Sequence, residues 1–169
     1  KADGSIDKYK AKLVVKGFRQ KEGFDYLDTY SPVTRIPSIS MLIASISLYN
    51  LEYHQMEVKT VFLNGKLDEE ICMEQPERFF VLEKEKKVCK LVKLLYGFKQ
   101  IPKQWHDKFD KAMMSNRFKI NECDKCVYIK NTDKGYVIVC LYVDDMLIIG
   151  SNNDMIKTTK KMLNKHFDM

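Results

Sequence analysis

The stretch of residues 137–149 constrains the fold more than any other part of the chain. Two apolar runs, VIVCLYV and MLII, are separated only by the adjacent acidic residues Asp144 and Asp145. Apolar runs of this length with many β-branched side chains favour buried strands, and two polar residues between them match the length of a tight hairpin turn. The sequence therefore predicts an antiparallel hairpin that carries two carboxylates at its tip.

These two carboxylates are candidates for a metal site. Like charges at the tip of an apolar hairpin repel one another, and a divalent cation removes that repulsion. Carboxylate oxygens are hard ligands that select Mg²⁺, with Mn²⁺ as the alternative. An ordinary solvated turn is the competing interpretation, because Asp is common in turns. The long apolar flanks and the preceding Tyr142-Val143 favour the functional interpretation.

A two-metal phosphoryl-transfer site needs a further carboxylate that bridges both ions. Glu57, near the end of a predicted strand over residues 53–58, is the candidate for this third ligand. By pattern alone, an exposed glutamate on a strand or helix surface is the simpler interpretation of this residue, so the pattern leaves its role open.

Helices and strands follow one another without strict βαβ alternation, which predicts an α+β fold, with an antiparallel sheet and helices packed on one face. Pro37 and Pro102 stand at helix starts, and Asn152 or Asn153 caps a last helix that reaches residue 167. Trp105 is expected in the core, on the apolar face of its helix. The other predicted helices span 38–50 and 103–116, and the predicted strands span 10–20, 53–58, 126–130, 136–143 and 146–149.

Composition narrows the class of protein without identifying a function. The 169 residues, 45% hydrophobic and 31% charged, suit one compact domain, and the net charge of +6 suits either a phosphate-rich partner or a solvated lysine-rich surface. The odd count of five cysteines argues against a complete disulfide framework, and Cys123 and Cys126 alone cannot close a tetrahedral zinc site. The longest apolar run, 136–143, is far shorter than the ~20 residues of a membrane helix. We therefore expect a soluble intracellular protein with no membrane partner.

Six segments, in order along the chain, resemble the reverse transcriptases of copia-type retrotransposons. The last of them, residues 140–150, contains Tyr142-Val143-Asp144-Asp145, which resembles the catalytic hairpin of these enzymes. The other five are KAKLVVKGFRQ (10–20), DYLDTYSPV (25–33), QMEVKTVFLNG (55–65), EICMEQP (70–76) and LYGFKQIPKQW (95–105). Together the segments extend over nearly the whole chain, so the resemblance does not depend on the acidic pair alone.

The resemblance implies a right-hand polymerase fold, with partial fingers over residues 1–50 and 66–100 and palm over residues 51–65 and 101–169. It implies RNA-directed DNA synthesis with two Mg²⁺ ions, from dNTPs, on a primer paired to an RNA or DNA template. The thumb, ribonuclease H and integrase regions of the family lie outside these motifs, and the last two are implied partners within the Pol polyprotein. The implied location is a cytoplasmic virus-like particle.

The resemblance also assigns the metal site residue by residue. Asp144 and Asp145 match the metal-binding pair of the family, and Glu57 stands where the family has its first catalytic Asp. The backbone of Val58 is a further implied ligand. These assignments make the three carboxylates one catalytic set.

A second set of implied residues surrounds the incoming nucleotide. Phe62 looks like the aromatic gate that rejects a ribose 2′-hydroxyl, with a buried core Phe as the alternative. Lys12 and Lys16 resemble the fingers cations that meet the triphosphate, although ordinary strand-surface lysines are an equal alternative. Tyr96-Gly97 resembles the segment that packs under the nucleotide. The residues implied to lie beside the template or primer are Pro102 and Tyr142.

Glu57 is also the main departure from the family. The extra methylene of glutamate moves the carboxylate by roughly 1 Å, and a misplacement of that size costs on the order of 10²-fold in rate. Val61 and Ile101 are also bulkier than the residues usual at their positions. We therefore expect weak or no polymerase activity from this copy. The alternatives are a non-catalytic nucleic-acid-binding remnant, a fragment without function, or a metal-dependent nuclease built on the same carboxylates.

Overall fold

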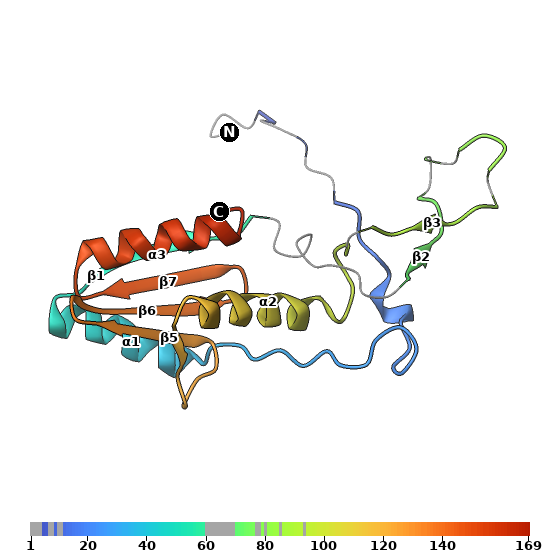
Figure 1. Cartoon of the computed structure of the whole chain (residues 1–169). Helices are drawn as coiled ribbons and strands as arrows, with labels where there is room; N and C mark the ends of the chain where they lie inside the picture. The colour runs from blue at the N-terminus through green and yellow to red at the C-terminus, as the bar shows by residue number, and fades with distance from the viewer. Residues whose placement is uncertain are drawn as a thin grey trace.

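Three α-helices and a five-stranded antiparallel sheet form the main body of the described part of the chain (Figure 1). The computed structural model describes residues 5–6, 9, 12–59, 70–76, 79, 81–84, 86–92 and 94–169. The helices are α1 (Ile36–Tyr49), α2 (Ile101–Ser115) and α3 (Asn153–His166), with a short 3-10 helix, η1 (Gly17–Arg19). The strands are β1 (Glu52–Glu57), β2 (Cys72–Met73), β3 (Cys89–Lys90), β4 (Lys119–Ile120), β5 (Val127–Thr132), β6 (Gly135–Tyr142) and β7 (Asp145–Gly150).

The main sheet has the strand order β1-β7-β6-β5-β4, and each neighbouring pair is antiparallel. The hairpins β5–β6 and β6–β7 form its centre, whereas β1 comes from much earlier in the chain and pairs with the free edge of β7. This long-range pairing places the end of β1 beside the β6–β7 turn. The strands β2 and β3 form a separate small sheet, which stands apart from the main body in Figure 1. The predicted α+β class and antiparallel sheet are confirmed.

The hydrophobic core lies between one face of the main sheet and the helices α2 and α3. Alternate residues of β6 and β7 face this core, and Val139, Met146 and Ile148 are fully buried in it. Phe109 of α2 and Leu163 of α3 pack against them and are equally inaccessible to solvent. Burying each of these side chains stabilises the fold by about 1.5–3 kcal/mol. The core therefore holds the β6–β7 hairpin rigidly against two helices.

Residues just before α1 attach that helix to the sheet. Thr34 donates a hydrogen bond to a backbone carbonyl of β6, and the Asp124 carboxylate accepts from the backbone N–H groups of Arg35, at 3.0 Å, and Cys126, at 3.1 Å. Burial pushes the pKa of Asp124 upward, but the hydrogen bonds, the strongest from Ser38, outweigh it and hold that pKa below its ordinary value. No side chain of α1, a fully described helix, is buried. The predicted packing of helices on one face of the sheet therefore holds for α2 and α3 but not for α1, which buries no side chain.

Several local predictions are confirmed. Asn152 caps α3, because its side-chain oxygen accepts from the backbone N–H of Met155 at 2.9 Å. The helix that was expected to start near Pro102 begins at Ile101. Ile101 itself is buried with Leu94 and Phe98, so its bulk fills a small second core. No helix in the described residues is long and apolar enough to cross a membrane.

Two predicted details are wrong, and each has a long-range cause. The turn between β6 and β7 consists of Val143 and Asp144, because Asp145 already pairs with Tyr142 as the first residue of β7. The segment 10–20 forms no strand in its described part, which makes a single parallel bridge from Val14 and then enters η1. At this turn Gly17 lies directly against the backbone of Gly97, since a Cβ built on Gly17 would be 1.9 Å from the Gly97 carbonyl oxygen.

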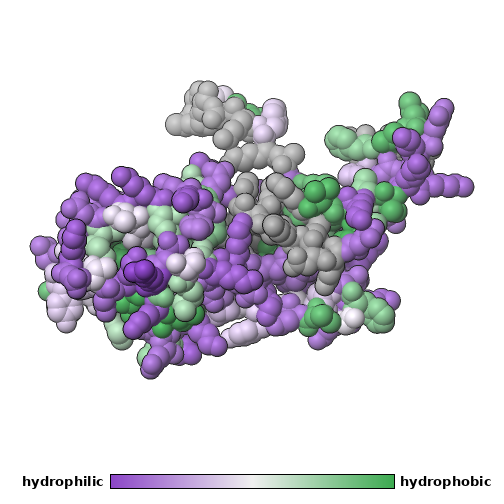
Figure 2. All heavy atoms as spheres, in the orientation of Figure 1, coloured by the Kyte–Doolittle hydropathy of each residue, from purple (hydrophilic) through white to green (hydrophobic). Residues whose placement is uncertain are grey.

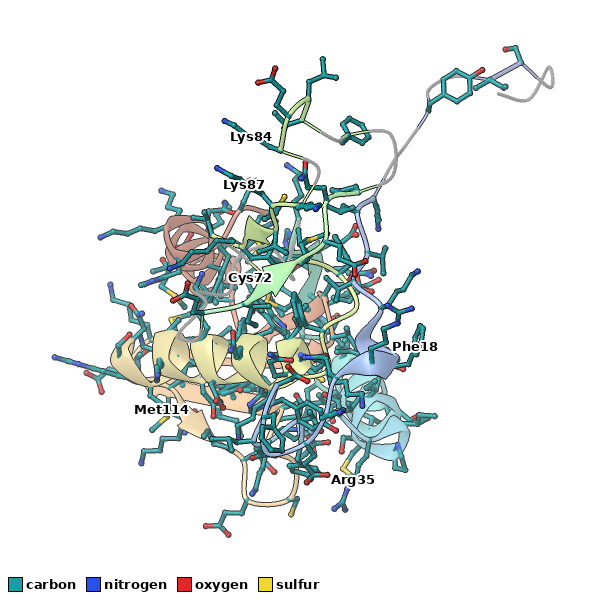
Figure 3. All side chains as sticks on the ribbon, turned by 90° about the vertical axis from the view of Figure 1, so that its right-hand side faces the viewer. Phe18, Arg35, Cys72, Lys84, Lys87 and Met114 are labelled. Atoms are coloured by element: carbon teal, nitrogen blue, oxygen red, sulfur yellow. The ribbon has the colours of Figure 1, made fainter. Side chains whose placement is uncertain are left out.

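The surface differs between the two ends of the molecule. Hydrophilic side chains dominate the visible surface of the sheet and helices, whereas hydrophobic groups gather around the β2–β3 connection and the segment near η1 (Figure 2). Phe18 on η1 is 78% exposed and points away from the body in Figure 3. Lys84 and Lys87 project from the β2–β3 connection in the same view. The end of the molecule with η1 and the β2–β3 connection therefore exposes apolar side chains and lysines together.

Candidate active site

The β6–β7 turn has a strained backbone. Val143 adopts a φ of 58°, and it alone of the two central turn residues has a positive φ. This pattern belongs to a type II′ turn, which prefers glycine at that place. A β-branched residue there costs about 1–2 kcal/mol. The surrounding structure must therefore hold the turn in this conformation.

Two hydrogen bonds from outside the hairpin hold the turn. The indole Nε1–H of Trp105, in the first part of α2, donates to the Val143 carbonyl oxygen at 2.7 Å. The backbone N–H of Val58, directly after β1, donates to the Asp144 carbonyl oxygen at 2.9 Å. Both donor residues are buried, with 5% and 2% of their surface exposed. The carbonyls of both central turn residues are therefore fixed by groups that are far away in the sequence.

The strand register brings two of the three predicted carboxylates together. Glu57 and Asp145 are directly opposite one another at the ends of β1 and β7. Residues opposite one another in an antiparallel pair point to the same face of a sheet. Because the neighbouring Met56 and Val58 face the helical core, Glu57 and Asp145 lie on the other face. Gln55, on that same face, donates from Nε2 to Asp145 Oδ1 at 3.2 Å.

Asp144 lies in the turn, one residue before Asp145, and is half-buried. The donor chemistry of Glu57, Asp144 and Asp145 suits Mg²⁺, because all three supply hard carboxylate oxygens. Among the described residues, no three His, Cys, Asp or Glu side chains gather closely enough to hold a metal ion. The fold thus supplies a carboxylate pair from two strands, with the third acidic residue on the adjoining turn.

The structure also brings together three of the residues implied for the nucleotide. The Lys12 ammonium lies 4.6 Å from the centre of the Tyr96 ring, and the backbone N–H of Val15 donates to the Tyr96 carbonyl at 2.7 Å. Gly97 follows with a φ of 99°, and a Cβ built there would lie 2.2 Å from the Val15 carbonyl oxygen. Lys16 is exposed and lines an open pocket. Lys12, Tyr96 and Gly97 therefore form one unit, with Lys16 beside it.

The segment 25–33 packs against the start of α2 and the residues directly before it. Asp28 forms an ion pair with Lys103, and this contact lowers the pKa of Asp28 and raises that of Lys103. The Lys99 ammonium lies 4.9 Å from the centre of the Tyr26 ring. Gln100 donates from Nε2 to a backbone carbonyl of the same segment at 3.3 Å. Two of the six sequence motifs are therefore packed on one another.

The remaining predicted site residues are placed as follows. Pro102 is exposed in the first turn of α2, and Tyr142 is 45% exposed at the end of β6. Phe62 and Val61 lie outside the described residues. The hydrogen bonds from Trp105 and the Val58 N–H to the turn were not predicted. No local pattern signals them, because each joins segments that only the tertiary fold brings together.

The buried thiols have no part in this site. Burial raises the pKa of Cys126 to about 11 and also raises the pKa of Cys140. Cys123, the other member of the CxxC pair, is exposed. The CxxC pair is therefore split between the core and the surface, which agrees with a structural interpretation of Cys126.

Comparisons with known proteins give one consistent result. The family described as reverse transcriptase (RNA-dependent DNA polymerase) matches residues 1–169. The chain is 48% identical over 168 residues to the retrovirus-related Pol polyprotein from transposon TNT 1-94 of Nicotiana tabacum, covering 99% of the chain and 13% of that protein. It is 33% identical over 168 residues to the corresponding polyprotein from transposon RE1 of Arabidopsis thaliana, covering 99% of the chain and 12% of that protein. The Ty1-ER2 Gag-Pol polyprotein of Saccharomyces cerevisiae is 29% identical over 172 residues, covering 95% of the chain and 9% of that protein. No solved structure matches.

Proposed function

Because the chain belongs to the reverse transcriptase (RNA-dependent DNA polymerase) family, with copia-type and Ty1-type Pol polyproteins as its relatives, we propose that it forms the fingers and palm of a retrotransposon reverse transcriptase. The fingers comprise residues 1–50 and 66–100, and the palm comprises residues 51–65 and 101–169. The observation that supports this proposal best is the register pairing of Glu57 with Asp145 beside a turn that carries Asp144.

In this proposal, Glu57, Asp144, Asp145 and the Val58 backbone would hold two Mg²⁺ ions. The bound ions supply Lewis acidity and countercharge for phosphoryl transfer. The carboxylates themselves fix where positive charge would gather, at the end of β1 and the start of β7, and therefore where a primer terminus and a nucleotide phosphate would meet. The strained turn and its two outside hydrogen bonds hold Asp144 in place before substrate arrives. This preorganisation is the main contribution that the protein makes to such a reaction.

The Lys12–Tyr96–Gly97 unit and Lys16 are the proposed nucleotide side of the site. Lysine ammonium groups attract the triphosphate, and the close backbone packing at Gly97 keeps Tyr96 in a fixed place beside them. Phe62 would select against ribonucleotides by contact with a 2′-hydroxyl. Pro102 and Tyr142 would lie beside the template and primer, which are RNA or DNA strands held mainly through their phosphates. Binding should therefore weaken steeply with salt.

The Glu57 side chain provides the test of this proposal. Glu57→Asp should raise Mg²⁺-dependent extension of a primer on an RNA template by up to the order of 10²-fold, because it removes a displacement of roughly 1 Å. The control is Glu52→Asp, which makes the same change on an exposed side chain at the other end of β1. Equal extension by the two variants would refute the catalytic role of position 57.

The same assay distinguishes a polymerase from the second candidate function, a non-catalytic nucleic-acid-binding remnant. The glutamate at position 57 favours this second candidate. A non-catalytic remnant would bind primer–template with a steep salt dependence and would show no extension in either variant. A nuclease would cleave the strands without added nucleotides. Extension that needs both dNTPs and Mg²⁺ distinguishes a polymerase from both.

A further inference from the structure

We propose that Trp105 is the positioning residue of the acidic turn, and that its indole N–H sets the orientation of the metal-binding carboxylates. This inference rests on the proposed function, because it concerns the same site. Trp105 contacts the backbone of Val143 and acts on Asp144 and Asp145 only through the turn conformation. It is therefore distinct from the residues that hold metal or substrate.

The position of the Trp105 ring is set by an aromatic cluster. Its ring centre lies 5.2 Å from that of Phe167, in an edge-on arrangement, and 5.7 Å from that of Phe109. Edge-to-face and tilted pairs at this separation are favourable geometries for aromatic rings. With 95% of its surface covered, the indole cannot turn to find another acceptor without disturbing the core. Its N–H is consequently directed at one place, the Val143 carbonyl.

The same cluster is connected to the segment that carries the third carboxylate. Phe167 is followed by Asp168, and the Asp168 carbonyl accepts from the backbone N–H of Lys59 at 2.8 Å. Lys59 lies two residues after Glu57. The acidic turn and the end of β1 are thus both tied to elements packed around Trp105, which makes this residue a shared support for both halves of the carboxylate set.

The strain in the turn explains why this support matters. With Val143 at a φ of 58°, the turn has a conformation that a valine does not choose by itself. The hydrogen bond from the buried indole to the carbonyl of the partly exposed Val143 offsets that strain. If the donor is removed, we expect the turn to relax, and the carboxylates on either side of the Asp144–Asp145 peptide bond to rotate with it.

The test replaces the donor while keeping the shape. Incorporation of 3-benzothienylalanine at position 105 substitutes sulfur for the indole N–H in a ring of nearly equal size. Mn²⁺ affinity, measured by electron paramagnetic resonance of the free ion, should fall at least 10-fold, which is the usual loss when an outer support of a metal ligand is removed. Trp105→Phe should show the same loss. The matched control is Phe109→Leu, which disturbs the same cluster but removes no hydrogen bond.

A second readout does not depend on metal. Trp105 is the single tryptophan of the chain, so its indole N–H gives one unambiguous NMR signal. Slow solvent exchange of that proton, and shifts of the Val143–Asp145 amides in the benzothienyl variant, support the inference. Fast exchange of the indole proton, or unchanged amide signals, would overturn the inference about Trp105, and neither result depends on metal binding. Failure of the wild-type chain to bind Mn²⁺ would instead count against the proposed function. An equal loss of Mn²⁺ affinity in Phe109→Leu would also overturn the inference.

Discussion

Replacing Gly97 with alanine should be among the most damaging single changes outside the core. A Cβ at this position would lie 2.2 Å from the Val15 carbonyl oxygen and 3.0 Å from a Val14 methyl group, and the φ of 99° is unfavourable for any L side chain. The oxygen belongs to the backbone, so no side-chain rotation relieves the clash. The segment must separate from Val15 and lose the 2.7 Å hydrogen bond between Val15 and Tyr96.

Three effects add in this variant. The left-handed backbone costs about 1–2 kcal/mol, overpacking costs about 1–3 kcal/mol, and the lost hydrogen bond costs about 1 kcal/mol. Since these effects partly relieve one another, we expect a loss of roughly 3–5 kcal/mol in the free energy of unfolding. Gly23→Ala is the matched control, because Gly23 has a φ of 81° but no atom within 4 Å of its added Cβ. The control should lose only the backbone cost of about 1–2 kcal/mol.

Urea unfolding of both variants, followed by circular dichroism, gives the two losses directly. The separation between them measures the close approach of the Gly97 and Val15 backbones. If both variants lose the same amount, the packing of residues 14–17 on residues 96–97 is incorrect, and the proposed Lys12–Tyr96 unit fails with it.

Two further predictions concern buried groups. Asp124→Asn should cost about 1–3 kcal/mol at pH 7, since it weakens the hydrogen bonds from the backbone N–H groups of Arg35 and Cys126, directly before α1 and β5. Folding lowers the pKa of Asp124, so its ionised form stabilises the fold fully above the ordinary pKa near 3.8. The difference in the free energy of unfolding between variant and wild type should therefore disappear as the pH falls through the lower pKa of the folded state. A difference that grows at low pH contradicts this. Alkylation of the native chain at pH 8 should be slow at Cys126 and Cys140, because burial raises the pKa of both thiols, and fast modification at either would show that it is accessible. The thiols expected to react quickly are the exposed Cys72, Cys89 and Cys123.

The features that could be predicted from the sequence are those with local causes. The Asn152 cap and the apolar hairpin depend on neighbours in the chain, and the structure confirms both. The predicted position of the turn was wrong by one residue, because Asp144 and Asp145 are equally polar and the sequence does not show which of them begins the strand. The choice between them depends on register and on donors from distant segments. The bent course of residues 14–19 likewise depends on Gly97, about 80 positions away.

The carboxylates of the candidate site could be predicted from the sequence, but the hydrogen bond from Trp105 could not. Motif order identified Glu57 and Asp145, and the pairing of β1 with β7 places them opposite one another. The part that Trp105 plays was hidden by its ordinary place on an apolar helix face. Its ring belongs to the core, as expected, while its N–H reaches the turn. A side chain with both an apolar body and one donor can serve packing and positioning together.

The role of the three carboxylates in catalysis is tested by comparing Glu57→Asp with the double variant Glu57→Asp/Asp145→Asn in Mg²⁺-dependent primer extension. Both changes lie at one register position, and asparagine keeps the size of the side chain while removing its charge. We expect extension by the first variant and a loss on the order of 10²-fold or more in the second. Comparable extension by both, or none by Glu57→Asp under conditions where the chain is folded and binds primer–template, would contradict this role.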